Sequence, residues 1–152
     1  RGVSGLDTAR VAMLAAVTGR HGQQRLADRE VFVATVGGIR LADPATDLAV
    51  CLAMASAALD HDGTPAAVPL DVAAIGEVTL SGDIRPTRMT NQRLAEAIRL
   101  GFRRILAPVG TRVAYDKPAD DHRIIEIPTL KAAIYEVLSM QRGGVRQRGN
   151  TR

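Results

Sequence analysis

The sequence predicts a single α/β domain with mixed strand pairing. Its 152 residues suffice for one ordinary domain and leave too little for two. Apolar residues make up 46% of the chain but aromatic residues only 3%, so small aliphatic side chains must build a closely packed interior. In the second half, runs of strand and helix character alternate, and this order favours parallel strand pairing.

The first half predicts an amphipathic helix followed by a strand. Leu6 to Thr18 places Leu14 and Val17 on one helical face, and two following glycines end the helix. Val31 to Val36 is rich in β-branched residues and ends at Gly37-Gly38, which predicts a strand and a turn or bulge.

A second helix is predicted from the pair Asp43-Pro44. Aspartate is a good N-cap and proline suits the first helical position. From Leu48 to Leu59 the helix is apolar or small nearly all round, so we expect it to be buried on more than one side. His61 to Pro65 is expected to be a loop.

The next segment predicts a hairpin and a third helix. Val72 to Leu80 and Ile84 flank Ser81-Gly82-Asp83, the expected turn between two antiparallel strands. Thr90 is the expected cap of a helix over 91–100, which a glycine then closes.

Two short strands and a last helix complete the predicted domain. The strands are Arg104 to Ala107 and Arg123 to Ile127, and Thr129 is the expected cap of a helix that runs to about Met140. We therefore assign a domain to residues 1–140 and a flexible basic tail to residues 141–152.

The net charge of +4 comes from that tail. It holds four arginines and no acid, so the remaining 16 basic and 16 acidic residues balance. A single cysteine, Cys51, excludes an intrachain disulfide and fits a reducing cytoplasm. No signal peptide or membrane span is expected, and a start without methionine suggests a fragment of a longer protein.

Self-contained catalysis finds little support in the residue pattern. Cys51 falls within the apolar helix, where an inert buried thiol is expected. His21, His61 and His122 share no spacing and supply no zinc pattern with one cysteine. No glycine-rich loop precedes a Lys-Ser/Thr pair, so we expect neither a nucleotide nor a metal site.

Two segments together resemble a known family. The stretch VATVGGIRLADPATDLA at residues 33–49 is similar to the strand, Gly-Gly turn and helix start of RadA (Sms) DNA-repair proteins. The stretch GEVTLSGDIRP at 76–86, followed by QRLAEA and GF, is similar to a segment that RadA proteins share with Lon proteases. The resemblance covers roughly residues 3–140 and implies a Lon-protease-like domain, with a ribosomal protein S5 domain 2-like fold of mixed sheet and flanking helices.

The same resemblance implies a domain without protease chemistry. Ala45 stands where Lon-type proteases hold the nucleophilic serine, and Asn91 stands where they hold the lysine base. A methyl group cannot attack a carbonyl and an amide cannot serve as a base. The hydroxyl of Thr46 lies one step further along the helix, about 100° round, where capping is its expected role.

The resemblance also implies partners and missing parts. RadA-like proteins carry a zinc finger and a RecA-like ATPase besides this domain, so ATP, Mg and Zn are expected there and no cofactor here. They act in homologous recombination, driving branch migration as ring-shaped motors on DNA. We accordingly expect a homo-oligomer, a hexameric ring, acting with single- or double-stranded DNA and a RecA-type recombinase in the cytoplasm at the nucleoid.

The arginines of the body suggest a DNA-facing surface. Arginine is suited to contacting phosphates without reading bases. The candidates are Arg85, Arg88, Arg93, Arg99, Arg103 and Arg104. Solvated arginines or salt bridges between subunits are the alternative interpretation of the same residues.

Three functions remain open on the sequence. The first is a ring-forming, DNA-binding scaffold, and the second is an oligomerisation module that makes no DNA contact of its own. The third is an active Lon-type peptidase that uses an unusual nucleophile such as Thr46 or Ser81.

Overall fold

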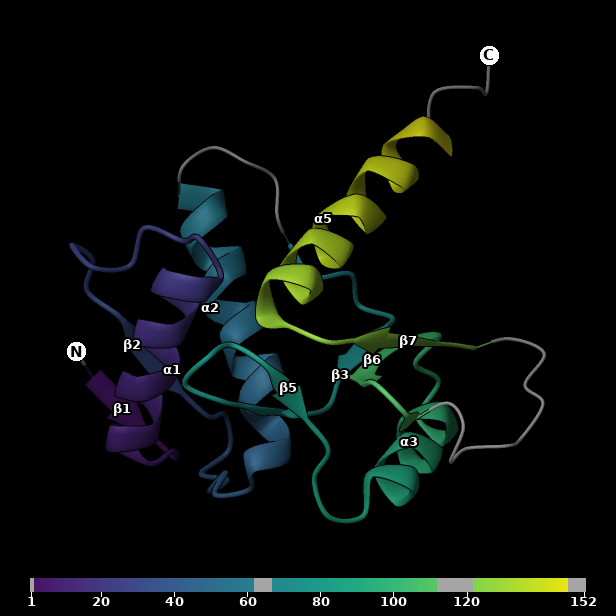
Figure 1. Cartoon of the computed structure of the whole chain (residues 1–152), viewed down its shortest axis with the longest axis horizontal. Coiled ribbons are helices and arrows are strands. Elements are labelled where there is room, and N and C mark those ends of the chain that lie inside the picture. Colours follow the sequence, from purple (N-terminus) through teal and green to yellow (C-terminus); the bar gives the residue numbers. More distant parts are fainter. Residues whose placement is uncertain (1, 62–66, 112–121, 148–152) are drawn as a thin grey trace.

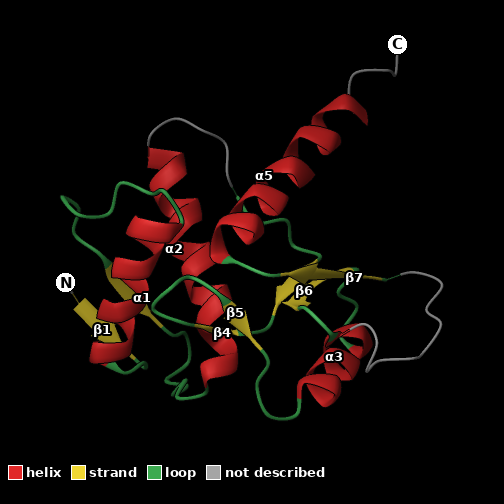
Figure 2. Ribbon diagram, in the orientation of Figure 1, coloured by secondary structure: helices red, strands yellow, loops and turns green. Residues whose placement is uncertain are grey.

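A computed structural model describes residues 2–61, 67–111 and 122–147 of the chain; the side chains of 60, 61 and 141–147 are outside the description. It shows a mixed α/β arrangement with parallel and antiparallel strand pairs, which confirms the predicted fold class (Figure 1; Figure 2). The predicted loop at 61–65 lies largely outside these residues, and its first residue belongs to a helix.

The N-terminal part places one helix beside a small parallel sheet. Strand β1 (Gly2–Ser4) pairs in parallel with β2 (Phe32–Ala34), and α1 (Thr8–His21) connects them. Helix α1 begins two residues after the predicted start at Leu6, because the Asp7 carboxylate accepts a hydrogen bond from the Arg10 N–H at 2.7 Å and caps it.

The second helical segment starts where the sequence predicts. Asp43 caps a 3₁₀ turn, η1 (Pro44–Thr46), which continues into α2 (Asp47–His61). The expectation of burial on more than one side holds for most of α2, including the fully buried Leu48 and Cys51. One face differs, because three alanines spaced by one turn, Ala49, Ala53 and Ala57, are exposed.

The run expected as one strand from Val72 to Leu80 divides into two. Strand β3 (Val72–Ala74) enters a parallel sheet with β6 (Arg104–Pro108), whereas β4 (Glu77–Val78) forms an antiparallel pair with β5 (Ile84–Arg85). The predicted turn between β4 and β5 is therefore confirmed and the single strand is wrong. The division falls at Gly76, where φ is +156° and an added Cβ would lie 2.6 Å from Ile84 Cγ2.

The parallel sheet β3-β6-β7 carries helices on both faces. Strand β7 (Arg123–Ile127) pairs in parallel with β6, as predicted. On one face Ile105 and Ala107 pack with Leu94 of α3 (Thr90–Arg99). On the other face Leu106 belongs to the larger core, to which α1, α2 and α5 (Leu130–Gln147) contribute.

The ends of two helices differ from expectation. Met89, at φ +60°, takes the N-cap position of α3, and the Thr90 hydroxyl instead donates to the Thr87 carbonyl at 2.7 Å. Helix α5 starts after Thr129, as predicted. The hydroxyl oxygen of Thr129 accepts a hydrogen bond from the Ala132 N–H and caps the helix. It continues beyond Met140 to Gln147, projecting away from the body (Figure 1). The flexibility of the basic tail stays a prediction, since 148–152 lie outside the description.

Candidate functional site

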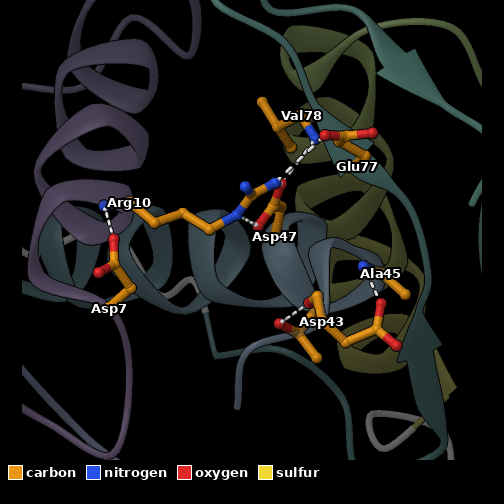
Figure 3. Close-up of polar contacts among 8 residues, drawn as sticks. Asp7, Arg10, Asp43, Ala45, Asp47, Glu77 and Val78 are labelled. Atoms are coloured by element: carbon orange, nitrogen blue, oxygen red, sulfur yellow. Dashed lines mark hydrogen bonds and ion pairs between the residues drawn. The ribbon is translucent and has the colours of Figure 1, made fainter.

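The first feature of the site is the helix start at Asp43. One oxygen of its carboxylate accepts a hydrogen bond from the Ala45 N–H at 2.9 Å (Figure 3). The other oxygen is bound by the Arg93 guanidinium. The bond from Ala45, together with the arginine, lowers the pKa of the Asp43 carboxyl. A side-chain anion of the chain itself therefore occupies the positive end of this helix.

At the first residue of α2, Asp47 forms an ion pair with Arg10 that the sequence analysis missed. Asp47 is 1% exposed and accepts two bonds from the Arg10 guanidinium, at 2.7 and 2.5 Å. It also accepts the N–H of Val78 at 3.2 Å, and Glu77 approaches the same arginine at 3.3 Å. These contacts tie α1, α2 and β4 together around one carboxylate (Figure 3).

Arg10 lies 37 residues from Asp47 and 67 residues from Glu77 along the chain, and no helical or strand period links such distant positions. No local pattern could therefore have indicated that Arg10, on the polar side of the first helix, reaches Asp47. The pairing depends on how α1 packs against α2, which is a tertiary feature. The bonds to Asp47, with Glu77 adding to them, raise the pKa of Arg10 far above its usual range.

The two family-like motifs meet at Gly76. Its N–H donates to the Ala45 carbonyl at 3.0 Å, and its own carbonyl accepts the Leu48 N–H at 3.1 Å. A side chain at this position would collide with Ile84 of β5, so glycine permits the close packing of this segment against the β4–β5 hairpin. Two backbone hydrogen bonds thus join the second motif to the helix start of the first.

Ala45 and Asn91 occupy contrasting surroundings. Ala45 is 4% exposed and packs in the cluster that contains Leu94 of α3, whereas Asn91 is exposed on the first turn of that helix. The Arg93–Asp43 ion pair also joins α3 to the helix start. The structure therefore brings the two segments together, with a buried methyl group at one position and an exposed amide at the other.

The hydroxyls considered as unusual nucleophiles are held by other groups. Thr46 donates to the Asp43 carbonyl at 2.8 Å, and Asp43, not Thr46, caps this helix start. Ser81 donates to the Asp83 carboxylate at 2.7 Å within the exposed β4–β5 turn. Lys131 lies on α5, and Lys117 falls outside the described residues.

Thiol and metal chemistry also find little support. Cys51 is fully buried, and burial raises the pKa of its thiol to about 12. Within the described ranges, no three His, Cys, Asp or Glu side chains gather in a way that could hold a metal ion.

No helix in the described part of the chain is both long and apolar enough to span a bilayer.

The candidate arginines lie in two groups at opposite ends of α3. Arg85, Arg88 and Arg93 lie around its first turn, and Arg99, Arg103 and Arg104 lie around its last. At 1.5 Å per residue, Arg93 and Arg99, the nearest members of the two groups on the helix, are roughly 9 Å apart along its axis. The six arginines are therefore divided between the two ends of α3, as a first and a second patch, and their role in DNA binding stays a prediction.

Several of these arginines are bound to internal carboxylates. Arg93 holds Asp43, Arg99 holds Glu96 at 2.8 and 2.6 Å, and Arg104 holds Asp71. By contrast, Arg85 and Arg88 are exposed, and no ion pair reaches either from the residues that the structure describes. We call these two residues the free arginine pair.

One further arginine belongs to the second patch. Arg123, at the start of β7, lies opposite Arg104 in the parallel register, and its N–H donates to the Arg103 carbonyl at 2.6 Å. The sequence analysis did not single it out. The predicted parallel order of the last two strands was the signal that could have placed it there.

Comparison with known proteins finds DNA repair proteins named RadA from several bacteria. The chain is 41% identical over 134 residues to the DNA repair protein RadA of Mycolicibacterium smegmatis, and 40% identical over 134 residues to that of Treponema pallidum. Each match covers 88% of this chain. The RadA of Escherichia coli is 42% identical over 104 residues, or 68% of this chain.

These matches cover only part of the relatives. The aligned region is 27% of the M. smegmatis protein, 28% of the T. pallidum protein and 22% of the E. coli protein. The chain thus spans about a quarter of the length of the relatives it matches. No protein-family model matches the chain.

Proposed function

This chain is a homologue of part of the RadA DNA repair proteins, and from that premise we propose that it is their non-proteolytic, Lon-like domain. In this proposal the domain assembles a hexameric ring and presents a DNA-binding surface that supports branch migration of recombination intermediates. ATP, Mg and Zn would be bound elsewhere in the polypeptide. The whole protein would act in the cytoplasm, at the nucleoid, beside a RecA-type recombinase.

The absence of a protease dyad is supported by the helix start. Proteolysis requires a nucleophile, a base and room for a developing oxyanion. Ala45 offers a buried methyl group, and Asn91 offers an exposed amide. The Asp43 carboxylate accepts the Ala45 N–H, so this donor is already engaged and is not available to an oxyanion at this helix end.

The observation that carries the DNA-binding proposal is the free arginine pair. Arg85 and Arg88 lie within four residues of each other, on β5 and on the loop before α3, and both are exposed. An exposed arginine without a protein carboxylate retains its full charge and its five donors for a phosphate. Such contacts position DNA without reading its sequence, as a motor that moves along DNA requires.

Assembly in a ring would strengthen this weak contact. Two phosphate contacts per subunit give little affinity at physiological salt, but simultaneous engagement by several subunits raises the overall affinity greatly. The proposal therefore links the two roles, since the ring makes a modest patch sufficient.

A pure oligomerisation module is the second candidate. The observation in its favour is that Arg93, Arg99 and Arg104 are engaged by internal carboxylates. On this alternative the arginines stabilise the fold, and DNA is handled by the rest of the polypeptide.

Two solution measurements separate these candidates. Light scattering reports the mass of the particle, and fluorescence anisotropy with a labelled random-sequence duplex reports binding at a series of salt concentrations. The proposal predicts oligomers that bind the duplex, with an affinity that falls steeply and linearly on logarithmic axes as salt rises. Oligomers that fail to bind even at low salt would support the alternative. Casein hydrolysis that a Thr46→Ala substitution abolishes would contradict both.

A further inference from the structure

An apolar groove runs between β2 and α2. Its volume is about 1040 Å³, and most of its lining side chains are apolar. Phe32, Val36 and Ile39, which line it, are 72%, 90% and 60% exposed. Large apolar groups concentrated in one hollow indicate a surface that is normally covered.

One wall of the groove is an open strand edge. Strand β2 pairs with β1, where the Gly2 N–H donates to the Val31 carbonyl and the Thr35 N–H donates to the Ser4 carbonyl. Main-chain groups alternate in direction along a strand, so those of Phe32 and Ala34 face away from β1. Among the described residues no strand pairs with this second edge.

The opposite wall is the exposed alanine face of α2. Ala49, Ala53 and Ala57 recur at one-turn spacing and line the groove. Methyl side chains allow another backbone to approach the helix closely. The spacing of these alanines also offers an apolar contact to every second residue of an extended chain.

The two-stranded sheet β1-β2 would be stabilised by a third strand. Parallel sheets occur with their faces covered, and a two-stranded sheet is marginal in water. An open apolar edge of this kind is also a site of unwanted association. A third strand in the groove would complete the sheet and bury the exposed apolar side chains together.

The charge of the groove favours a peptide as its occupant. Of the described residues that line it, one arginine and one glutamate, Arg29 and Glu30, are charged, and their charges balance. Arg29 also donates to the Ala58 carbonyl at 3.1 Å. The described lining residues form no positive patch that could attract nucleic acid, and the free arginine pair is not among them.

We infer that the groove receives an extended strand with apolar residues at alternate positions, supplied by the RadA-type polypeptide outside these 152 residues. The relatives supply the argument for this source, since the matched region is 27% of the M. smegmatis protein. A second copy, pairing through the free edge of its own β2, is the competing occupant that the test below distinguishes. The inference depends on the homology to RadA and not on DNA binding.

The test compares the 152-residue chain with a full-length RadA-type polypeptide that carries the same residues. Amide hydrogen exchange is measured at Phe32 and Ala34. The expected result is fast exchange in the shorter chain and protection by about 100-fold or more in the longer one. Equal, fast exchange in both would overturn the inference, whatever the outcome of the DNA-binding measurements.

A substitution in the groove supplies a second, independent readout. Ala53→Glu leaves its carboxylate in water in the shorter chain, where the thermal midpoint should stay unchanged. In the longer polypeptide the same carboxylate would be buried beneath the added strand, lowering the midpoint by about 5 °C or more. The control is Ala16→Glu, an exposed alanine of α1 outside the groove, which should change neither protein.

Two outcomes of this experiment would overturn the inference. The first is an Ala53→Glu effect that is the same in both proteins. The second is a shorter chain that is a dimer by light scattering and that Ala53→Glu converts to a monomer, because a second copy would then be the occupant. If the longer variant fails to fold, the exchange rates of the two unsubstituted proteins still decide the question.

Discussion

The Asp43 carboxylate accepts a hydrogen bond from the backbone N–H of Ala45 at 2.9 Å. The same carboxylate is held by Arg93 of α3, so the helix start, the buried alanine and the third helix form one fixed unit. This unit lies where the family resemblance places protease chemistry. Its contacts explain why a serine at position 45 and a lysine at position 91 should not produce peptidase activity.

The double substitution Ala45→Ser with Asn91→Lys should give no peptidase activity. Asn91 is exposed, so a lysine there would stay hydrated and protonated near its ordinary pKa of about 10.4. A serine at position 45 would have no base, and Asp43 would still occupy the backbone N–H at that position. Casein and peptide hydrolysis are the assays, with the unsubstituted chain as the control. Turnover that needs both substitutions would contradict this account of the site.

Loss of the Arg10 guanidinium should destabilise the domain strongly. An Arg10→Leu substitution leaves the Asp47 carboxylate, 1% exposed, without its ionic partner. Removing one partner of a buried pair costs about 3–5 kcal/mol in the free energy of unfolding. Urea denaturation measures the loss. The matched control is Arg99→Leu, whose exposed pair with Glu96 should contribute nothing measurable, and equal effects of the two changes would contradict the prediction.

The stabilisation that Asp71 provides should fade in acid. Its hydrogen bond from Arg104 lowers the pKa of the carboxyl in the folded protein. Its contribution is therefore fully present above the unfolded value of about 3.9 and is lost as the pH falls through the lower folded value. The difference in unfolding free energy between the wild type and Asp71→Asn should shrink between neutral pH and pH values below about 4.

Urea titrations at several pH values test this behaviour. The exposed Asp28, replaced by asparagine, serves as the comparison, and it should show no comparable change. A constant difference for Asp71→Asn down to the acid limit would show that the ion pair with Arg104 contributes nothing to stability.

The thiol of Cys51 should be unreactive in the folded protein. It is fully buried, and its pKa is raised to about 12, so little thiolate exists at pH 8. Ellman's reagent should modify it at the rate of unfolding in water and at once in denaturant. Rapid modification in native conditions would show that α2 opens locally and would contradict the packing described for it.

Local signals predicted most of the secondary structure because they act within a few residues. Asp43 and Pro44 mark the start of the second helical segment as expected, and Thr129 caps the last helix. Thr90 failed as a cap because the preceding residues form a turn around its hydroxyl. The run through Val72 looked like one strand because its division at Gly76 depends on contacts with the helix start.

The candidate site was only partly predictable for the same reason. Ala45 and Asn91 were identified by resemblance, and the structure places their segments together. That Arg10 would reach Asp47 depends on the packing of two helices and leaves no trace in sequence spacing. Which arginines are neutralised also depends on tertiary contacts, and this distinction leaves Arg85 and Arg88 as the residues to test.

The salt dependence of duplex binding tests the central proposal most directly. Each phosphate contact contributes about 0.9 to the slope of log affinity against log salt, so removing two contacts should make the slope shallower by about 1.8 per subunit. The Arg85→Ala/Arg88→Ala double variant should show this change, whereas Arg99→Ala, whose guanidinium is bound by Glu96, should keep the wild-type slope. A double variant with an unchanged slope and affinity would contradict the assignment of DNA binding to the free arginine pair.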